Sequence, residues 1–236
     1  MNCGTCNWFA DESVLPDRTE FFGGFMNKSG WRAAMKTLPR SLAVLALTLG
    51  ACSSAPVHFY TLVKPAAPVD GAAAAAFAIA VQPVSLPAQV DMPQLVVRQG
   101  PGALALIESE QWIAPLSDEL RAALAAELGA RLGVVDVYRL PRNAAVPVYR
   151  IQFDVQRFES TLAQSARIEA LWTIQPPEKN SPQVTCASRV SESVGEGYAA
   201  LVEGHQRALA KIAENIAQVF TSAKPPNALG ACPSSS

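Results

Sequence analysis

A cysteine directly after a short apolar run carries the most specific chemistry in this sequence. The tetrapeptide Leu49-Gly50-Ala51-Cys52 has the form of a bacterial lipobox, and the apolar run 41–49 follows Lys36 and Arg40. This run is about half as long as a bilayer-spanning helix, so the sequence predicts a cleaved signal peptide. The expected chemistry is cleavage before Cys52 and transfer of a diacylglycerol to its sulfur, which would anchor the chain to a membrane.

The residues after Cys52 argue against the alternative that this cysteine is buried in a core helix. The segment Ser53-Ser54-Ala55-Pro56 would interrupt a helix at once. We therefore expect residues 35–51 to be the signal peptide and residues 52–57 to be a polar tether.

Residues 1–34 do not fit this organisation, because a secretory signal normally opens a chain. We expect the working protein to start at Met35 or Met26, with residues 1–34 as an upstream extension that is not part of it. Cys3 and Cys6 in this extension have the spacing of a redox or zinc half-site. A lone CxxC motif outside a βαβ pattern is a weak signal, so we give it no function.

Two further cysteines, Cys186 and Cys232, lie in the part of the chain that follows Cys52. Two thiols in the oxidising envelope of a bacterium tend to pair. A Cys186–Cys232 disulfide would attach the C-terminal tail to a strand. The alternative is one buried thiol and one thiol in a flexible tail, and the sequence favours neither.

Few residues suit catalysis, a metal or a cofactor. His58 and His205 have no cysteine or carboxylate at a metal-ligand spacing, and His205 falls near the apolar face of a helix, where a packed histidine is expected. Glu108 and Glu110 lie near a turn, where we expect solvated carboxylates. No nucleophile is paired with a base, so an enzyme is disfavoured and no cofactor or metal is expected. A formal net charge of −1 without a basic block argues against nucleic acid as a partner.

Hydrophobic periodicity divides the rest of the chain into strands and two helices. Strands are expected at 58–62, 77–84, 94–99, 103–108, 134–140, 149–156, 168–174 and 184–194. One helix is expected after Ser117, a plausible N-cap, up to Leu132, and the other over 198–220. The sequence predicts a single α+β domain over 58–222, with two long amphipathic helices packed on one face of a mainly antiparallel sheet. Residues 223–236 are expected to be a disordered tail.

A series of segments in a fixed order is similar to a known family. The lipobox is followed by Tyr60-Thr61-Leu62, by Val84-Ser85-Leu86-Pro87, by Asp91-Met92-Pro93-Gln94-Leu95-Val96-Val97-Arg98, by Glu110-Gln111-Trp112-Ile113-Ala114-Pro115-Leu116, by Leu171-Trp172 and by Tyr198-Ala199-Ala200-Leu201-Val202. The series resembles the PqiC/YmbA family, the auxiliary lipoproteins of ABC-type and MCE-type lipid transport systems, over about 52–220. Gln89-Val90 and Met92 depart from the pattern, where the family leads us to expect an aromatic or leucine and an arginine.

The resemblance implies an outer-membrane lipoprotein that faces the periplasm and docks on a transport assembly built around an MCE protein. Ser53 fits this location, because the aspartate that retains lipoproteins in the inner membrane is absent there. The expected role is binding without catalysis. The number of copies stays open, and a homo-oligomer is one alternative.

Partner contacts are expected at the 86–93 loop together with Arg98, and at the 112–115 entry to the first helix. The candidate residues are Pro87, Asp91, Arg98 and Trp112. Each has a simpler explanation in the fold. Arg98 suits an exposed strand position, Asp91 suits a turn, and Trp112 suits the core.

Three other functions remain as alternatives. An assembly or structural lipoprotein would bind another periplasmic or outer-membrane protein. A tethered enzyme would need polar groups that converge in a pocket, and a lipid shuttle would need an apolar cavity of roughly several hundred Å³.

Overall fold

The computed structural model describes residues 56–65, 76–141, 146–178, 180–222 and 229–233, which belong to one compact unit. Cys52, the expected signal peptide and residues 1–34 lie outside the described residues. Within the described part, no helix is both long enough and apolar enough to cross a membrane.

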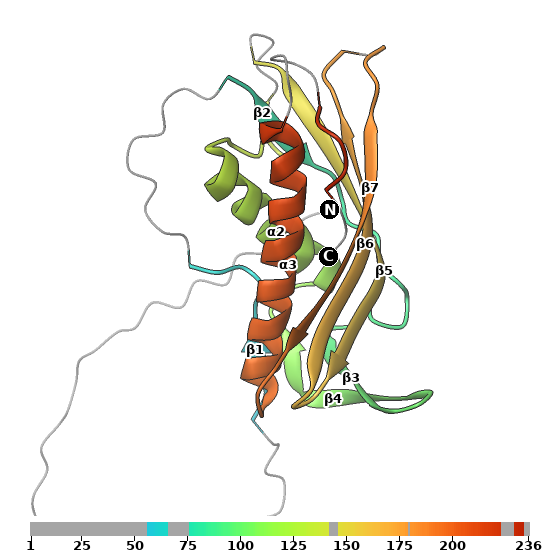
Figure 1. Cartoon of the computed structure of the whole chain (residues 1–236). Coiled ribbons are helices and arrows are strands. Elements are labelled where there is room, and N and C mark those ends of the chain that lie inside the picture. The colour runs from blue at the N-terminus through green and yellow to red at the C-terminus, as the bar shows by residue number, and fades with distance from the viewer. Residues whose placement is uncertain (1–55, 66–75, 142–145, 179, 223–228, 234–236) are drawn as a thin grey trace, which may run out of the picture. The chain divides into compact units, whose positions relative to one another are not determined.

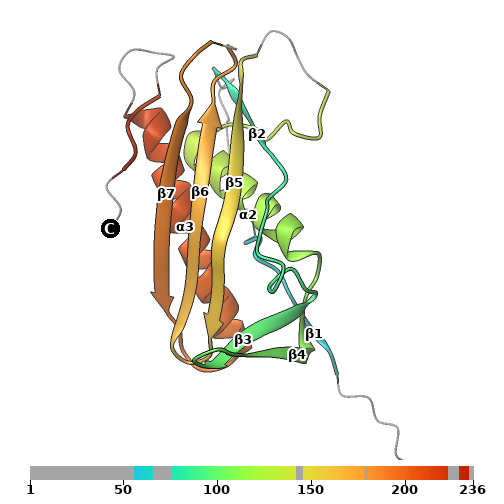
Figure 2. The ribbon, with the colours of Figure 1, turned by 90° about the vertical axis from the view of Figure 1, so that its right-hand side faces the viewer.

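Alternating side chains build the larger of two sheets. β5 (Val148–Thr161), β6 (Ser165–Gln175) and β7 (Val184–Ser193) form an antiparallel meander, and β2 (Ala78–Val81) pairs in parallel with β5. The strand order is β2-β5-β6-β7 (Figure 2). In β5 and β6 nearly every second side chain is buried, as the alternation of apolar and polar residues predicts.

A smaller sheet contains the remaining three strands. β3 (Gln94–Gly100) and β4 (Ala103–Trp112) form an antiparallel hairpin, and β1 (His58–Tyr60) pairs in parallel with the end of β4. The hairpin turns at Gly102, whose φ of 79° suits a residue without a Cβ. The strand order is β1-β4-β3.

Two long helices complete the fold (Figure 1). α2 (Leu116–Leu132) ends at Gly133, which adopts the left-handed conformation that is common for a glycine directly after a helix. α3 (Tyr198–Thr221) contacts β6 and β7, whereas α2 contacts α3 and β2. One apolar core joins the helices to both sheets, and its fully buried members include Leu95, Leu120, Leu124, Leu128, Ile151, Ile168, Trp172, Ile174, Ile212 and Ile216.

Gly204 allows α3 to lie close to the β6–β7 end of the larger sheet. A Cβ at this position would overlap the Val194 side chain and would lie 2.9 Å from the Cβ of Ala166. A glycine inside a helix costs about 1 kcal/mol relative to alanine, so close packing is the reason for its place here.

The C-terminal segment 229–233 returns to the fold. Cys232 is bonded to Cys186 of β7, with their Cα atoms 5.6 Å apart, and Gly230 donates a hydrogen bond to the Val219 carbonyl at 2.8 Å. The two cysteines are therefore joined in a disulfide, which is one of the two alternatives that the sequence left open. Residues 223–236 were predicted to be a disordered tail, but the structure describes 229–233 in contact with the fold. The rest of 223–236 lies outside the described residues.

The start of α2 differs from the prediction. The Pro115 carbonyl accepts hydrogen bonds from the N–H groups of Asp118 and Glu119, at 2.8 and 3.0 Å, so Pro115 is the N-cap and not Ser117. Proline suits the position before a helix because its φ is already close to the helical value.

The strand predicted at 134–140 is also wrong. Val135 and Val137 exchange backbone hydrogen bonds with Ile79, and Asp136 forms only an isolated bridge with that residue. The next donor on β2, Val81 N–H, is taken by the Asp136 side chain at 3.1 Å, so the ladder ends after one residue.

The α+β class is confirmed and the pairing is mainly antiparallel, as predicted, but the strands form two sheets instead of one, and each sheet contains one parallel pair. The parallel pairs β1–β4 and β2–β5 join strands that are far apart in the chain. Alternation within one segment does not specify such partners, which explains the error.

Candidate protein-docking surface

The outer side of the β3–β4 hairpin presents apolar side chains to solvent. Val96 pairs with Leu106, and Arg98 pairs with Leu104, so these four side chains share one face. Leu104 is 44% exposed and Leu106 is 49% exposed. Leu95 of β3 points the other way and is fully buried.

A bulge in β4 separates this exposed part from a buried part of the same strand. Leu95 pairs with Ile107, yet the preceding Gln94 pairs with Gln111, so β4 has extra residues between these pairs. An odd number of extra residues reverses the faces of a strand. Leu106 and Glu110 are an even number of residues apart and would share one face of a strand without a bulge. Because of the bulge, Leu106 points outward, whereas Glu110 points inward and is buried.

The loop that precedes β3 borders the hairpin. Pro87 and Val90 of this loop line a cavity of about 210 Å³ together with Val96, Arg98 and residues 156–160 of β5. Asp91 and Met92 of the same loop are exposed. The structure thus brings the predicted residues Pro87 and Arg98 to one cavity beside the apolar face of the hairpin.

Arg98 has a structural partner at this cavity. It forms an ion pair with Glu159 of β5, which is also paired with Arg157 at 3.3 Å. Burial by itself would raise the pKa of Glu159, but the two guanidinium groups outweigh it and hold the pKa below its usual range. Arg98 therefore attaches the hairpin to the larger sheet, in addition to lining the cavity.

Trp112 is not available to a partner in this structure. Its side chain is 5% exposed and packs edge to face on Phe158, with ring centroids 6.1 Å apart. Its simpler explanation as a core aromatic fits the structure, so we define the hairpin surface by Pro87, Met92, Arg98, Leu104 and Leu106.

A buried carboxylate cluster was missed by the sequence reasoning, which placed Glu110 in solvent. Glu110 accepts hydrogen bonds from Tyr60 Oη at 2.7 Å and from Ser109, and its Oε1 lies 2.9 Å from His58 Nδ1. Burial would raise the pKa of Glu110, but the hydrogen bonds from His58, Tyr60 and Ser109 lower it below the usual value. The prediction failed because the bulge in β4, which turns Glu110 inward, has no local sequence signal.

The Glu110 cluster has a structural role. Burial, and then the hydrogen bond to Glu110 and its charge, raise the pKa of Tyr60 to about 12, which makes this phenol a poor acid or base near neutral pH. The cluster lines neither the cavity beside the hairpin nor the hollow at the β2–β5 edge. A second buried carboxylate, Glu119, accepts bonds from Thr61 Oγ1 and Leu62 N–H, both at 2.7 Å. Both glutamates attach the first described segment to the rest of the fold.

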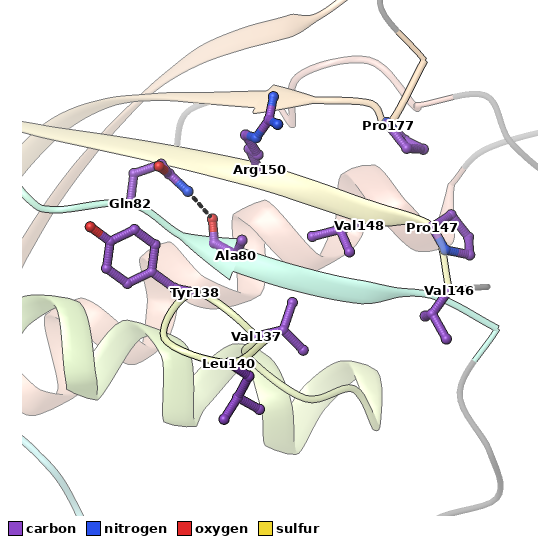
Figure 3. Close-up of a pocket in the computed structure, with 10 residues that line it drawn as sticks. All are labelled: Ala80, Gln82, Val137, Tyr138, Leu140, Val146, Pro147, Val148, Arg150 and Pro177. Atoms are coloured by element: carbon purple, nitrogen blue, oxygen red, sulfur yellow. Dashed lines mark hydrogen bonds between the residues drawn. The ribbon is translucent and has the colours of Figure 1, made fainter. Parts of the chain in front are cut away.

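Another hollow lies at the β2–β5 edge of the larger sheet (Figure 3). It has a volume of about 440 Å³. It is lined by Ala80, Gln82, Val137, Tyr138, Leu140, Val146, Pro147, Val148, Arg150 and Pro177. Ala80 pairs with Arg150, so their side chains share the face opposite to the buried Ile79 and Ile151. The hollow is thus on the surface and separate from the core. Within the described residues, no group of His, Cys, Asp and Glu is arranged to hold a metal ion.

Comparison with known proteins agrees with an auxiliary, lipid-anchored class of protein. The chain belongs to the family of ABC-type transport auxiliary lipoprotein components, which it matches over residues 60–217. No curated protein matches it in sequence.

Two solved structures have a similar fold. An uncharacterized protein is 18% identical, with a TM-score of 0.58 over 70% of this chain and 98% of that chain. A Xanthomonas campestris protein of the DUF330 family is 21% identical, with a TM-score of 0.52 over 70% of this chain and 96% of that chain. At such identities the likeness shows the fold alone.

Proposed function

We propose that this chain is a non-catalytic accessory subunit that is anchored by lipid at Cys52 in the outer membrane and docks on an MCE-type lipid transport assembly. The observation that carries the proposal is the match to the auxiliary lipoprotein family over most of the folded unit. The lipobox ending at Cys52 supports the anchor, and Ser53 supports export to the outer membrane.

The hairpin surface is the part of the fold that suits docking. Leu104 and Leu106 are exposed on paired strands of a hairpin, so little backbone conformational entropy is lost when a partner covers them. Burying a leucine side chain contributes roughly 1.5–3 kcal/mol. Exposed apolar side chains that gather on one face, beside a polar rim that includes Arg98, are typical of protein interaction sites.

The contacts of the titratable groups support a role without catalysis. Glu110 and Glu119 are occupied by hydrogen bonds within the fold, and His205 is buried against Phe158 and Ser160. A catalytic group must reach a substrate, which these side chains do not in this conformation.

The docking claim is tested by a double substitution, Leu104→Glu with Leu106→Glu, in the lipidated protein. Both side chains are exposed, so the fold should persist, whereas two carboxylates in an apolar interface should abolish co-purification of an MCE-domain protein from solubilised envelope. Leu171→Glu is the matched control, because Leu171 is 44% exposed on β6 of the other sheet.

Three results would contradict the proposal in different ways. Equal recovery of an MCE-domain protein by the double variant and the control would remove the docking surface from the hairpin. Recovery of a different envelope protein would favour an assembly or structural lipoprotein. An unmodified Cys52 in the intact mass of the purified protein would remove the lipid anchor.

A further inference from the structure

Three exposed apolar side chains lie at the start of the described chain, away from the hairpin surface. Val57 is 43% exposed, Phe59 is 57% exposed, and Ile113 is 61% exposed. We name these three residues the β1 patch. Phe59 lies on β1, an edge strand of the smaller sheet.

The pairing of β1 with β4 places Phe59 and Ile113 on the same side of the sheet. Phe59 is opposite Gln111, and the chain continues two residues further to Ile113, whose N–H donates to the Tyr60 carbonyl at 2.8 Å. Paired residues, and residues two apart in a strand, point to the same face. The buried residues Glu110 and Trp112 occupy the opposite face.

The segments that carry the patch contain no acidic side chain, no lysine and no arginine, and the neighbouring carboxylate of Glu110 is buried and paired with His58. Residues 53–63 and 111–117 contain no Asp, Glu, Lys or Arg. An exposed apolar patch without flanking charges loses little solvation when it enters an interface of low polarity.

We propose that the β1 patch inserts into the headgroup region of the membrane that holds the lipid anchor, and this inference rests on the proposed lipidation of Cys52. Only four residues separate Cys52 from Val57, and the five Cα–Cα steps between these two residues span at most about 18 Å when the chain is fully extended. A bilayer with its headgroups is about 40–45 Å thick, so the tether keeps the patch within half of that thickness of its lipid. The short tether is why we assign the patch to the bilayer and not to a distant protein.

Contact at the patch would give the domain a fixed orientation on the membrane. A lipid anchor alone leaves a tethered domain free to rotate, whereas Phe59 and Ile113 add a second point of attachment on a paired strand and its neighbour. The hairpin surface, on the other side of the β4 bulge, would then be held at a constant height above the membrane.

A single spin label at residue 59 or 113 tests the insertion. The lipidated mature chain should have no free thiol, because Cys52 is acylated and Cys186 is bonded to Cys232, so Phe59→Cys or Ile113→Cys creates one reactive site. The protein is reconstituted in vesicles of phosphatidylethanolamine and phosphatidylglycerol. Collisions of the label with oxygen and with a water-soluble nickel chelate then report its depth. Leu171→Cys is the control, since its exposure is similar and it lies on the other sheet.

The inference predicts that labels at 59 and 113 collide severalfold less with the nickel chelate than the label at 171, and more with oxygen. Equal nickel accessibility at all three sites, with intact-mass proof of lipid on Cys52, would overturn the inference and leave the anchor standing. If the label at 59 is shielded from the nickel chelate even in protein without detergent or lipid, a second copy of the chain covers the patch. That result would also overturn the inference. A Cys52 that carries no lipid would overturn the anchor and this inference together.

Discussion

Two buried side chains contribute to the pH dependence of the stability of this protein, and both have hydrogen-bond partners from distant parts of the chain. Glu110 binds His58 and Tyr60 of β1, and His205 of α3 shares a hydrogen bond of 2.8 Å with Ser160 of β5. Their pKa values are both lowered in the folded protein, for different reasons.

We expect Glu110→Gln to destabilise the protein at neutral pH. The folded pKa of Glu110 is lower than its unfolded value, so its contribution is present above about pH 4.5 and is lost as the pH falls through the folded pKa. Loss of charged hydrogen bonds at a buried site costs about 1–3 kcal/mol. Urea unfolding at pH 7 and at pH 3 should show a large difference from wild type at pH 7 and a smaller one at pH 3.

Glu108→Gln is the control for that substitution, because the Glu108 side chain is exposed and its carboxylate accepts a hydrogen bond only from Gln94 among the described residues. An equal loss of stability for the Glu108 and Glu110 variants would contradict the structural role of the buried cluster.

His205 should make stability fall when the pH drops below 6.5. Burial lowers its pKa from 6.5 to about 3, so between these values the unfolded chain binds a proton that the folded protein does not. The free energy of unfolding should therefore decrease with falling pH, by at most about 1.4 kcal/mol per unit for one proton.

His205→Gln is the variant that tests this dependence. Glutamine keeps a hydrogen-bonding group for Ser160 but does not titrate, so the slope of stability between pH 6.5 and 4.5 should become flatter, even if the variant is less stable overall. The wild-type protein, measured over the same pH range, is the comparison. An unchanged slope in the His205 variant would refute the assignment.

At the scale of elements, the packing of α3 depends on the glycine where it meets the end of β7. Gly204→Ala should destabilise the protein by about 1–3 kcal/mol, because the added methyl group overpacks against Val194. The higher helix propensity of alanine offsets up to about 1 kcal/mol of this loss. Gly100→Ala is the control, since a Cβ there meets nothing within 4 Å. Thermal unfolding of both variants measures the difference, and a Gly204 variant as stable as the Gly100 variant would contradict the close approach.

The sequence predicted those elements whose pattern is local. The β5–β7 meander and both helices follow from alternation and from apolar spacing of three and four residues. The β4 bulge, the parallel partners of β1 and β2, and the brief bridge at Asp136 depend on contacts between segments that are far apart. For the same reason, Pro87 and Arg98 could be proposed from the sequence but Leu104 and Leu106 could not. The exposure of the two leucines depends on which side of the bulge they lie.

In the whole molecule, the proposed lipid attachment and the proposed docking surface belong to different parts of the chain. The chain enters the fold at β1, which Glu110 and Glu119 hold in place, and the other end of the chain is fixed by the Cys186–Cys232 disulfide. A disulfide fits a protein of the oxidising envelope. Between these ends the hairpin surface presents exposed leucines and a charged rim.

The most direct test of the central claim is site-specific photocrosslinking in living cells, with a photoreactive residue at Leu106 and, separately, at Leu171. Both positions are exposed strand residues, but only the first belongs to the hairpin surface. The account predicts an adduct at 106 whose second component is an MCE-domain protein in mass spectrometry, and no such adduct at 171. An adduct at 171 and none at 106, or an adduct at 106 with an unrelated protein, would contradict it.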